Sequence, residues 1–257
     1  MRLLRCKGLC IGEGIPKIVV PVMGAAVEQS IAAATDAIAA GEDIIEWRAD
    51  FSANNPDAAS LVADAAELAA ACKTTPLLFT LRTVEEGGRS HVSNEEYCAL
   101  MRALIGSGSI DVIDIEQRLG EHVVRDLVSA AHTQGVAAIV SSHDFQGAPS
   151  QEAMMKTLAT MHEWGADIAK LAVTAHTMAD SLRVMAATAE LHRAHPDYLM
   201  ATMAMGSAGS ITRLMGECCG SALAFCSHNE ESAPGQVEVT RARRIMNAVH
   251  DSIERDQ

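Results

Sequence analysis

Lys170 lies near the middle of a short apolar segment, "DIAKLAV" at residues 167–173. A buried, unpaired ammonium group costs several kcal/mol or more, so such a lysine is usually paired or neutral. An edge strand whose lysine reaches out to water is the alternative. If both faces of the strand are buried instead, the neutral amine is a nucleophile that can form an imine with a ketone.

Other titratable side chains end the neighbouring apolar segments. Glu46 and Arg48 are two residues apart, so they lie on one face of a strand. Each group has a structural alternative, such as an ion pair between Glu46 and Arg48 or a hydrogen-bonded structural histidine. Because five successive segments carry such groups, we interpret them as one site. Its further members are Arg82 with Glu86 beyond it, Glu116, and His143 with Asp144.

Eight short apolar segments alternate with longer amphipathic ones along the chain. The expected strands are 17–23, 43–49, 76–82, 110–116, 136–142, 167–173, 198–204 and 222–227. The expected helices are 25–40, 57–73, 93–106, 120–134, 150–164, 179–194, 209–219 and 237–255. Eight strand–helix units with apolar strands predict an α/β fold, a (β/α)8 TIM barrel. We expect one domain over residues 1–257, in which residues 1–12 form a strand pair that closes the N-terminal end of the barrel.

A doubly wound open sheet is the second fold considered. It would bind a dinucleotide through a glycine-rich turn between its first strand and the next helix. "GEGIPK" at 12–17 precedes a strand and opens no helix, so it does not meet this requirement.

In a barrel of this kind the chemistry lies at the C-terminal ends of the strands. Both faces of a barrel strand are buried, so Lys170 cannot point to solvent, and burial next to Arg48, Arg82 or Arg213 favours the neutral amine. His143, on the neighbouring strand, is suited to move a proton at the carbon next to an imine. Glu86 is placed to orient its imidazole, and the arginines suit a carboxylate on the substrate.

Composition limits the partners and the compartment. The net charge is −13 for 257 residues, which disfavours nucleic acid and anionic membranes as partners. The seven cysteines form no ligand or disulfide pattern and fit reduced thiols in the cytoplasm. We see no secretion signal and no apolar run long enough to cross a bilayer. His192 and His195 have no third ligand in view, so no metal is expected.

Several motifs, in order along almost the whole chain, resemble the type I 3-dehydroquinate dehydratases. They are "EWRADF" (46–51), "LFTLRTVEEGG" (78–88), "IDIE" (113–116), "SSHDF" (141–145), "KLAV" (170–173), "MGSAGSITRLMGECCGSALAF" (205–225) and "SAPGQV" (232–237). The resemblance implies a (β/α)8 barrel, a homodimer, and a role in the shikimate pathway. It also implies syn elimination of water from 3-dehydroquinate, giving 3-dehydroshikimate, through a lysine imine and without metal or cofactor.

The resemblance also assigns roles to residues. It implies Lys170 as the imine-forming lysine, His143 as the general acid and base, and Glu86 as the partner of His143. It implies a lid at 228–236, "HNEESAPGQ", which nothing in its composition would hold in place when the site is empty. At Pro21 the family members have a serine that ends the first strand, so a hydrogen bond to the substrate is in question here. The implied substrate contacts are Glu46, Arg48, Arg82, Arg213, Ser232 and Gln236.

Two other functions share part of this pattern. A class I aldolase also uses an imine-forming lysine on a barrel, but it usually needs a phosphate-binding site after the seventh and eighth strands. A non-catalytic protein that senses dehydroquinate or quinate should have lost the lysine or the histidine, and both Lys170 and His143 are present.

Overall fold

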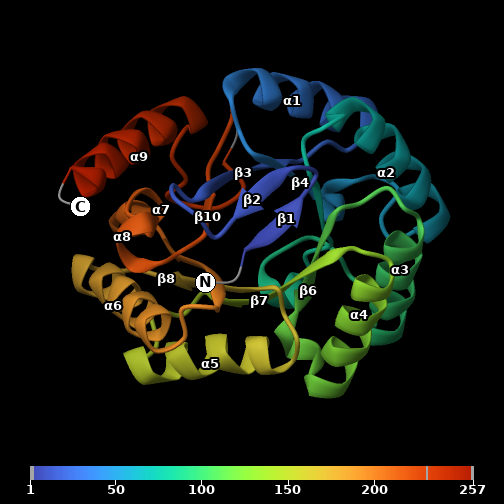
Figure 1. Cartoon of the computed structure of the whole chain (residues 1–257). Helices are drawn as coiled ribbons and strands as arrows, with labels where there is room; N and C mark the ends of the chain where they lie inside the picture. Colours follow the sequence, from blue (N-terminus) through green and yellow to red (C-terminus); the bar gives the residue numbers. More distant parts are fainter. Residues whose placement is uncertain (1–2, 230, 256–257) are drawn as a thin grey trace.

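The computed structural model describes residues 3–229 and 231–255, and its centre is a barrel of eight parallel strands (Figure 1). The strand order around the barrel is β10-β3-β4-β5-β6-β7-β8-β9. A hydrogen bond of 2.7 Å from the Ala222 N–H to the Met200 carbonyl joins β10 to β9 and brings the ends of the sheet together. The TIM barrel prediction is confirmed. The strands are β3 (Lys17–Val22), β4 (Ile44–Arg48), β5 (Leu77–Thr80), β6 (Val112–Glu116), β7 (Ala137–Asp144), β8 (Ile168–Thr174), β9 (Leu199–Met205) and β10 (Leu223–Phe225).

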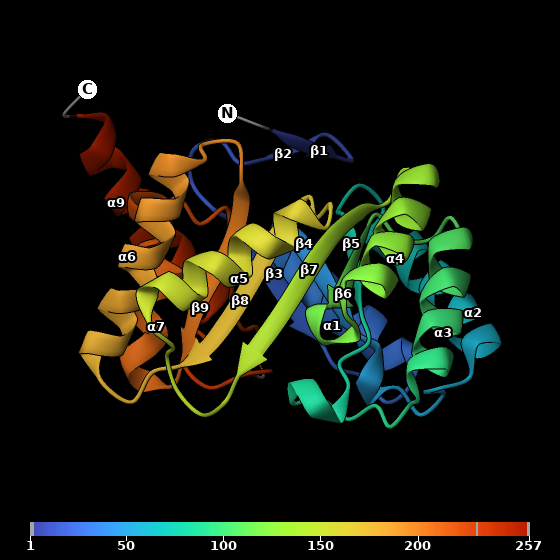
Figure 2. The same cartoon turned by 90° about the horizontal axis from the view of Figure 1, so that it is seen from below.

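Helices alternate with the strands and cover the outside of the barrel (Figures 1 and 2). They are α1 (Val27–Ala40), α2 (Ala58–Cys72), α3 (Asn94–Gly106), α4 (Glu121–Thr133), α5 (Gln151–Glu163), α6 (Met178–Ala194), α7 (Ser210–Leu214), α8 (Gly216–Cys219) and α9 (Val239–Glu254). Across residues 3–229 and 231–255 we find no helix with the length and apolar character needed to span a membrane.

The single helix expected at 209–219 is wrong, because this segment forms two short helices, α7 and α8. The second begins at Gly216, and glycine is a poor helix former. Four short 3-10 turns were also not predicted. They follow four of the strands, at Ala49–Phe51, Val84–Glu86, Gln117–Leu119 and Ser207–Gly209.

An antiparallel hairpin lies across the N-terminal end of the barrel (Figure 2). It consists of β1 (Leu4–Cys6) and β2 (Leu9–Ile11). Cys6 and Ile11 are buried and pack in one cluster with inward-facing strand residues such as Val19. The hairpin therefore closes this end, as predicted for residues 1–12, and leaves the opposite end open.

Three aspartates join neighbouring strands at the closed end of the barrel, and we call these contacts the basal clasps. Asp43, Asp111 and Asp167 each stand directly before an even-numbered strand, β4, β6 or β8. Each backbone N–H donates to the carbonyl of one residue at the start of the preceding strand, at 2.9–3.0 Å. Each carboxylate also accepts the N–H of that same residue, at 2.7–2.9 Å. The strand residues are Ile18, Leu77 and Ala138, respectively.

Candidate active site

A cavity of about 160 Å³ opens at the C-terminal mouth of the barrel. It gathers side chains from six strands or the loops that follow them: β4, β5, β7, β8, β9 and β10. Glu116 and Asp144, which the sequence analysis also placed in the site, do not line this cavity. The other nine predicted residues do: Glu46, Arg48, Arg82, Glu86, His143, Lys170, Arg213, Ser232 and Gln236.

Lys170 lies in a layer of inward-facing side chains contributed by alternate strands, the arrangement that fills TIM barrels. The layer consists of Glu46 on β4, Asp114 on β6, Lys170 on β8 and Phe225 on β10. Lys170 Nζ is 2.9 Å from Asp114 Oδ2 and 3.6 Å from Glu46 Oε1. The same atom lies 4.1 Å from the centre of the Phe225 ring, a cation–π contact.

The nearest charges to Lys170 are therefore carboxylates, which the sequence analysis did not place beside it, whereas it expected Arg48, Arg82 or Arg213 nearby. The reason is geometric, because alternate strands contribute one layer and the arginines lie in others. The lysine is buried, with its side chain 5% exposed. The two carboxylate oxygens and the Phe225 ring are therefore its closest polar and aromatic contacts.

Asp114 is the main residue that sequence reasoning missed. Burial raises the pKa of its carboxyl group, but Arg82 and Lys170 outweigh this effect and hold the pKa well below its usual value. Ser141 also donates to this carboxylate, at 2.5 Å. The signal was present in "IDIE", because Asp114 and Glu116 share one face of the strand just as Glu46 and Arg48 do.

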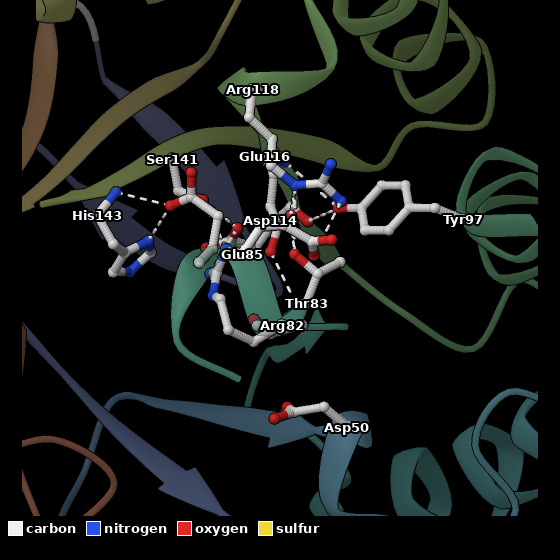
Figure 3. A network of polar contacts seen from close by, with 12 residues as sticks. Asp50, Arg82, Thr83, Glu85, Tyr97, Asp114, Glu116, Arg118, Ser141 and His143 are labelled. Atoms are coloured by element: carbon white, nitrogen blue, oxygen red, sulfur yellow. Dashed lines mark hydrogen bonds and ion pairs between the residues drawn. The ribbon is translucent and has the colours of Figure 1, made fainter. Parts of the chain in front are cut away.

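Arg82 is held at the centre of a buried network (Figure 3). Its Nη2 is 2.8 Å from Asp114 Oδ1, and its Nη1 donates to Glu116 at 3.1 Å and to Ser141 at 3.0 Å. Burial alone lowers its pKa, but Asp114 and Glu116 reverse the effect and raise it. Glu116 also accepts from Thr83, through both the N–H and the hydroxyl, so the network fixes the loop that leads to Glu86.

Glu86 and His143, which the sequence analysis expected to interact, are in contact. Its Oε2 lies 2.9 Å from His143 Nδ1 and accepts the His143 backbone N–H at 2.7 Å. Burial, with the positive charges of Arg82 and Lys170, holds the pKa of His143 well below its usual value. Burial also raises the pKa of Glu86 to about 7. The imidazole is thus neutral, and the contact at Nδ1 leaves Nε2 as its free base.

Arg48 and Arg213 differ in how their charge is balanced. Arg48 forms a two-point ion pair with Asp50, at 2.7 and 2.8 Å. Arg213 donates to two backbone carbonyls, Ala204 at 2.6 Å and Gly235 at 3.3 Å. Within residues 3–229 and 231–255 it forms no ion pair with a carboxylate, and burial lowers its pKa to about 10. An anionic group in the cavity would complete its environment.

The segment that carries Ser232 and Gln236 forms hydrogen bonds within itself and to the loop that follows β9. The two residues bond to each other, since Gln236 accepts the Ser232 N–H at 2.8 Å and donates to its hydroxyl at 3.0 Å. Gly206 N–H donates to the Pro234 carbonyl at 3.0 Å, and the Ser210 hydroxyl donates to Gly235 at 3.1 Å. Glu230, which was part of the expected lid, lies outside the described residues.

Gly235 has two reasons to be glycine. Its φ is +81°, in the left-handed region, and a Cβ would collide with the Gly206 carbonyl. The close approach to Gly206 is a tertiary contact that the sequence does not reveal.

The sequence analysis did not predict two aromatic residues that lie in the site. The structure also shows where Pro21 lies relative to the cavity. Phe225 lies on Lys170, and the Phe145 ring stacks over His143 with centroids 6.3 Å apart. Pro21 faces Glu46 across β3 and β4 but lines a different cavity, next to His228. It is therefore not a wall of the cavity that contains Lys170.

Comparison with known proteins gives one consistent result. A sequence model of the type I 3-dehydroquinase family matches residues 18–253. The 3-dehydroquinate dehydratases of Salmonella agona and Bacillus licheniformis are 39% and 38% identical over 252 residues, which is 98% of this chain and 100% and 99% of the relatives.

Solved structures agree with these relatives. A type I 3-dehydroquinate dehydratase from Clostridium difficile, solved with covalently modified comenic acid, matches with a TM-score of 0.94 and 37% identity. The match covers 98% of this chain and 99% of that one. A 3-dehydroquinate dehydratase from Geobacillus kaustophilus matches with a TM-score of 0.93 and 33% identity, over 97% of each chain.

Proposed function

Because the chain belongs to the type I 3-dehydroquinase family, we propose that it dehydrates 3-dehydroquinate through an imine on Lys170. This activity is that of a hydro-lyase of the shikimate pathway. The observation that carries the proposed role is the position of Lys170 Nζ, which faces the cavity between two carboxylates. The covalent modification named for the Clostridium difficile relative supports a nucleophile in this cavity.

The chemistry begins when the neutral Lys170 amine adds to the ketone carbon and one of its protons moves to the ketone oxygen. The hydroxyl so formed takes a second proton from solvent and leaves as water, and the proton that stays on nitrogen makes the imine protonated. Asp114 and Glu46 lie next to this nitrogen and stabilise its positive charge. The imine withdraws electrons from the adjacent carbon and so acidifies its proton. The positive charge of the imine therefore forms next to the carboxylates of Asp114 and Glu46.

His143 then moves one proton twice. Its Nε2 takes the proton from the acidified carbon, and the resulting imidazolium gives it to the departing hydroxyl, which leaves as water. One group acting on one side of the ring accounts for a syn elimination. Hydrolysis of the imine releases 3-dehydroshikimate and restores the Lys170 amine.

The charged side chains of the cavity other than Lys170, His143 and Glu86 are available to bind the substrate. We assign the substrate carboxylate to Arg213, because its guanidinium lines the cavity without a carboxylate partner in the described part of the chain. Arg48, Arg82 and Glu46 are the remaining charged contacts. Ser232 and Gln236 offer hydrogen bonds to ring hydroxyls from a lid over the mouth, and substrate would replace the bonds that they now make to each other.

The assembly and the compartment are also proposals. We propose a homodimer in the cytoplasm, on the resemblance to the family. All seven cysteines are free thiols, which supports a reducing compartment. Met178 and Leu182, one turn apart on α6, are 50% and 55% exposed and provide apolar surface for assembly. Light scattering coupled to gel filtration measures the state, and a monomer would contradict the proposed dimer.

Borohydride trapping tests the proposed role of Lys170. Reduction during turnover of 3-dehydroquinate should leave the substrate skeleton on Lys170, and peptide mass analysis should locate it there. Lys170→Ala should give neither adduct nor enone absorbance while keeping its fold. An adduct on another lysine would refute the assignment. Cleavage of a carbon–carbon bond would indicate an aldolase, and binding without turnover a sensor.

A further inference from the structure

The basal clasps and the layer around Lys170 lie on the same strands at a constant spacing. Asp43 precedes Glu46, Asp111 precedes Asp114, and Asp167 precedes Lys170, by three residues in each case. At a rise of about 3.3 Å per residue, each clasp lies roughly 10 Å below an ionisable group of the layer.

The fourth strand pair provides a natural comparison. In β9 and β10 the position that corresponds to the clasp aspartate is Ala222, three residues before Phe225. Its N–H still donates to the Met200 carbonyl, but its side chain has no acceptor. Clasps therefore occur on the three strands that bring a charge to the layer and are missing from the strand that brings an aromatic ring.

The charges of the layer depend on the height of each strand along the barrel axis. Lys170 Nζ has one carboxylate oxygen at 2.9 Å and another at 3.6 Å. A shift of about 1 Å along the axis would take the shorter contact out of hydrogen-bonding range. Misplacement of a reacting group by about 1 Å can cost on the order of 100-fold in rate.

A clasp is suited to set this height, because its carboxylate adds a contact that the strand ladder does not supply. Each carboxylate is also held from outside by a different element. Arg243 on α9, Lys7 in the hairpin and His132 on α4 lie 2.6–2.9 Å from Asp43, Asp111 and Asp167, respectively. The clasps thus connect the covering elements to the charged layer.

We propose that Asp43, Asp111 and Asp167 are positioning residues, which act on the reaction by fixing the height of Glu46, Asp114 and Lys170. The inference rests on the proposed role of Lys170. Asp167 carries the sharpest consequence, because it directly precedes the strand of the nucleophile and does not line the cavity.

Asp167→Ala is the central test, with Asp167→Asn as the conservative variant. The measurements are kcat, KM and the rate of borohydride-trapped imine formation in a single turnover. Asp167→Ala should slow imine formation and kcat by about 100-fold, with KM changed by less than about threefold. Asp167→Asn should recover most of the rate, since an amide oxygen can still accept the Ala138 N–H.

Two control variants separate positioning from stability and from charge. Asp57→Ala removes an exposed helix cap that accepts the Ser60 N–H, so it should lower stability without changing imine formation. His132→Ala removes the outer partner of Asp167 and leaves the contact with Ala138, so it should also keep the rate. If Asp167→Ala does not fold, Asp43→Ala tests the same idea through Glu46 and should slow imine formation.

Different results overturn different claims. A wild-type adduct that does not map to Lys170 would refute the proposed function before any variant is made. With the adduct on Lys170, a folded Asp167→Ala of normal rate would overturn the positioning role. So would an Asp167→Asn as slow as Asp167→Ala, or an Asp43→Ala of normal rate.

Discussion

Two buried arginines of the same cavity should respond to the same substitution with opposite changes in stability. Arg213 is 2% exposed, and burial lowers its pKa to about 10. Each pKa unit below the ordinary value corresponds to about 1.4 kcal/mol, so the charged group is roughly 3 kcal/mol less stable in the fold than in water. Its two hydrogen bonds to backbone carbonyls together stabilise the folded state by roughly 2 kcal/mol. Arg213→Met should therefore stabilise the empty protein by about 1 kcal/mol.

Arg82 is the matched control, since it is 4% exposed and lines the same cavity. Its pKa is raised, because Asp114 and Glu116 pair with it. Arg82→Met removes the guanidinium that two buried carboxylates share, although Lys170 and Arg118 still contact them, and should destabilise the protein by about 3 kcal/mol.

Urea denaturation followed by tryptophan fluorescence measures both effects, since Trp47 is buried in the core. Enzyme kinetics should show the functional side, with Arg213→Met raising the KM for 3-dehydroquinate by about 100-fold, because the substrate carboxylate loses its partner. If Arg213→Met lowered the free energy of unfolding by more than about 2 kcal/mol, or if both variants lost equal stability, the protein itself would already balance the charge of Arg213.

Three further predictions follow from the site and the closed end of the barrel. His143→Ala should still form an imine that borohydride traps, with turnover slower by about 100-fold or more, and normal turnover would assign the proton transfer to another group. Limited proteolysis should cut within 228–236 in the free protein, and trapping of 3-dehydroquinate should protect it; equal cleavage would argue against a lid. Glu42 has both carboxylate oxygens buried without a hydrogen-bond partner in the described structure, and burial raises its pKa to about 7. Its penalty is absent below about pH 4.5 and grows as the pH rises through 7, so Glu42→Gln should stabilise the protein by about 1–2 kcal/mol at pH 8 and have little effect at pH 4.5, as urea titrations at both pH values would show.

The sequence predicts the barrel and most of its mouth because both depend on local pattern. Alternation within a strand places Glu46 and Arg48 on one face, and the apolar segments predict the strand order of a barrel. Partners from non-adjacent strands do not follow from this pattern. Asp114 was missed for this reason, since its contact with Lys170 needs the layer of alternate strands.

The same limit explains the two arginines. From the sequence alone, Arg82 and Arg213 are equally good candidates to bind a substrate carboxylate. Only tertiary structure shows that Arg82 is already paired with Asp114 and Glu116, whereas Arg213 meets backbone carbonyls. The hydrogen bond from Gly206 to Pro234 likewise joins two segments, and no pattern in their sequences indicates that they lie together.

The pairing of β10 with β3 has a consequence for how the chain acquires its activity. Leu223 pairs with Lys17, so the first and last strands of the barrel meet across about two hundred residues. During synthesis the first seven strands can associate in order, but the ring must wait for its last strand. Phe225, Arg213 and the lid all belong to that late segment. A growing chain therefore contains Lys170 and His143 long before the barrel closes around them. Catalytic activity should be among the last properties that folding produces.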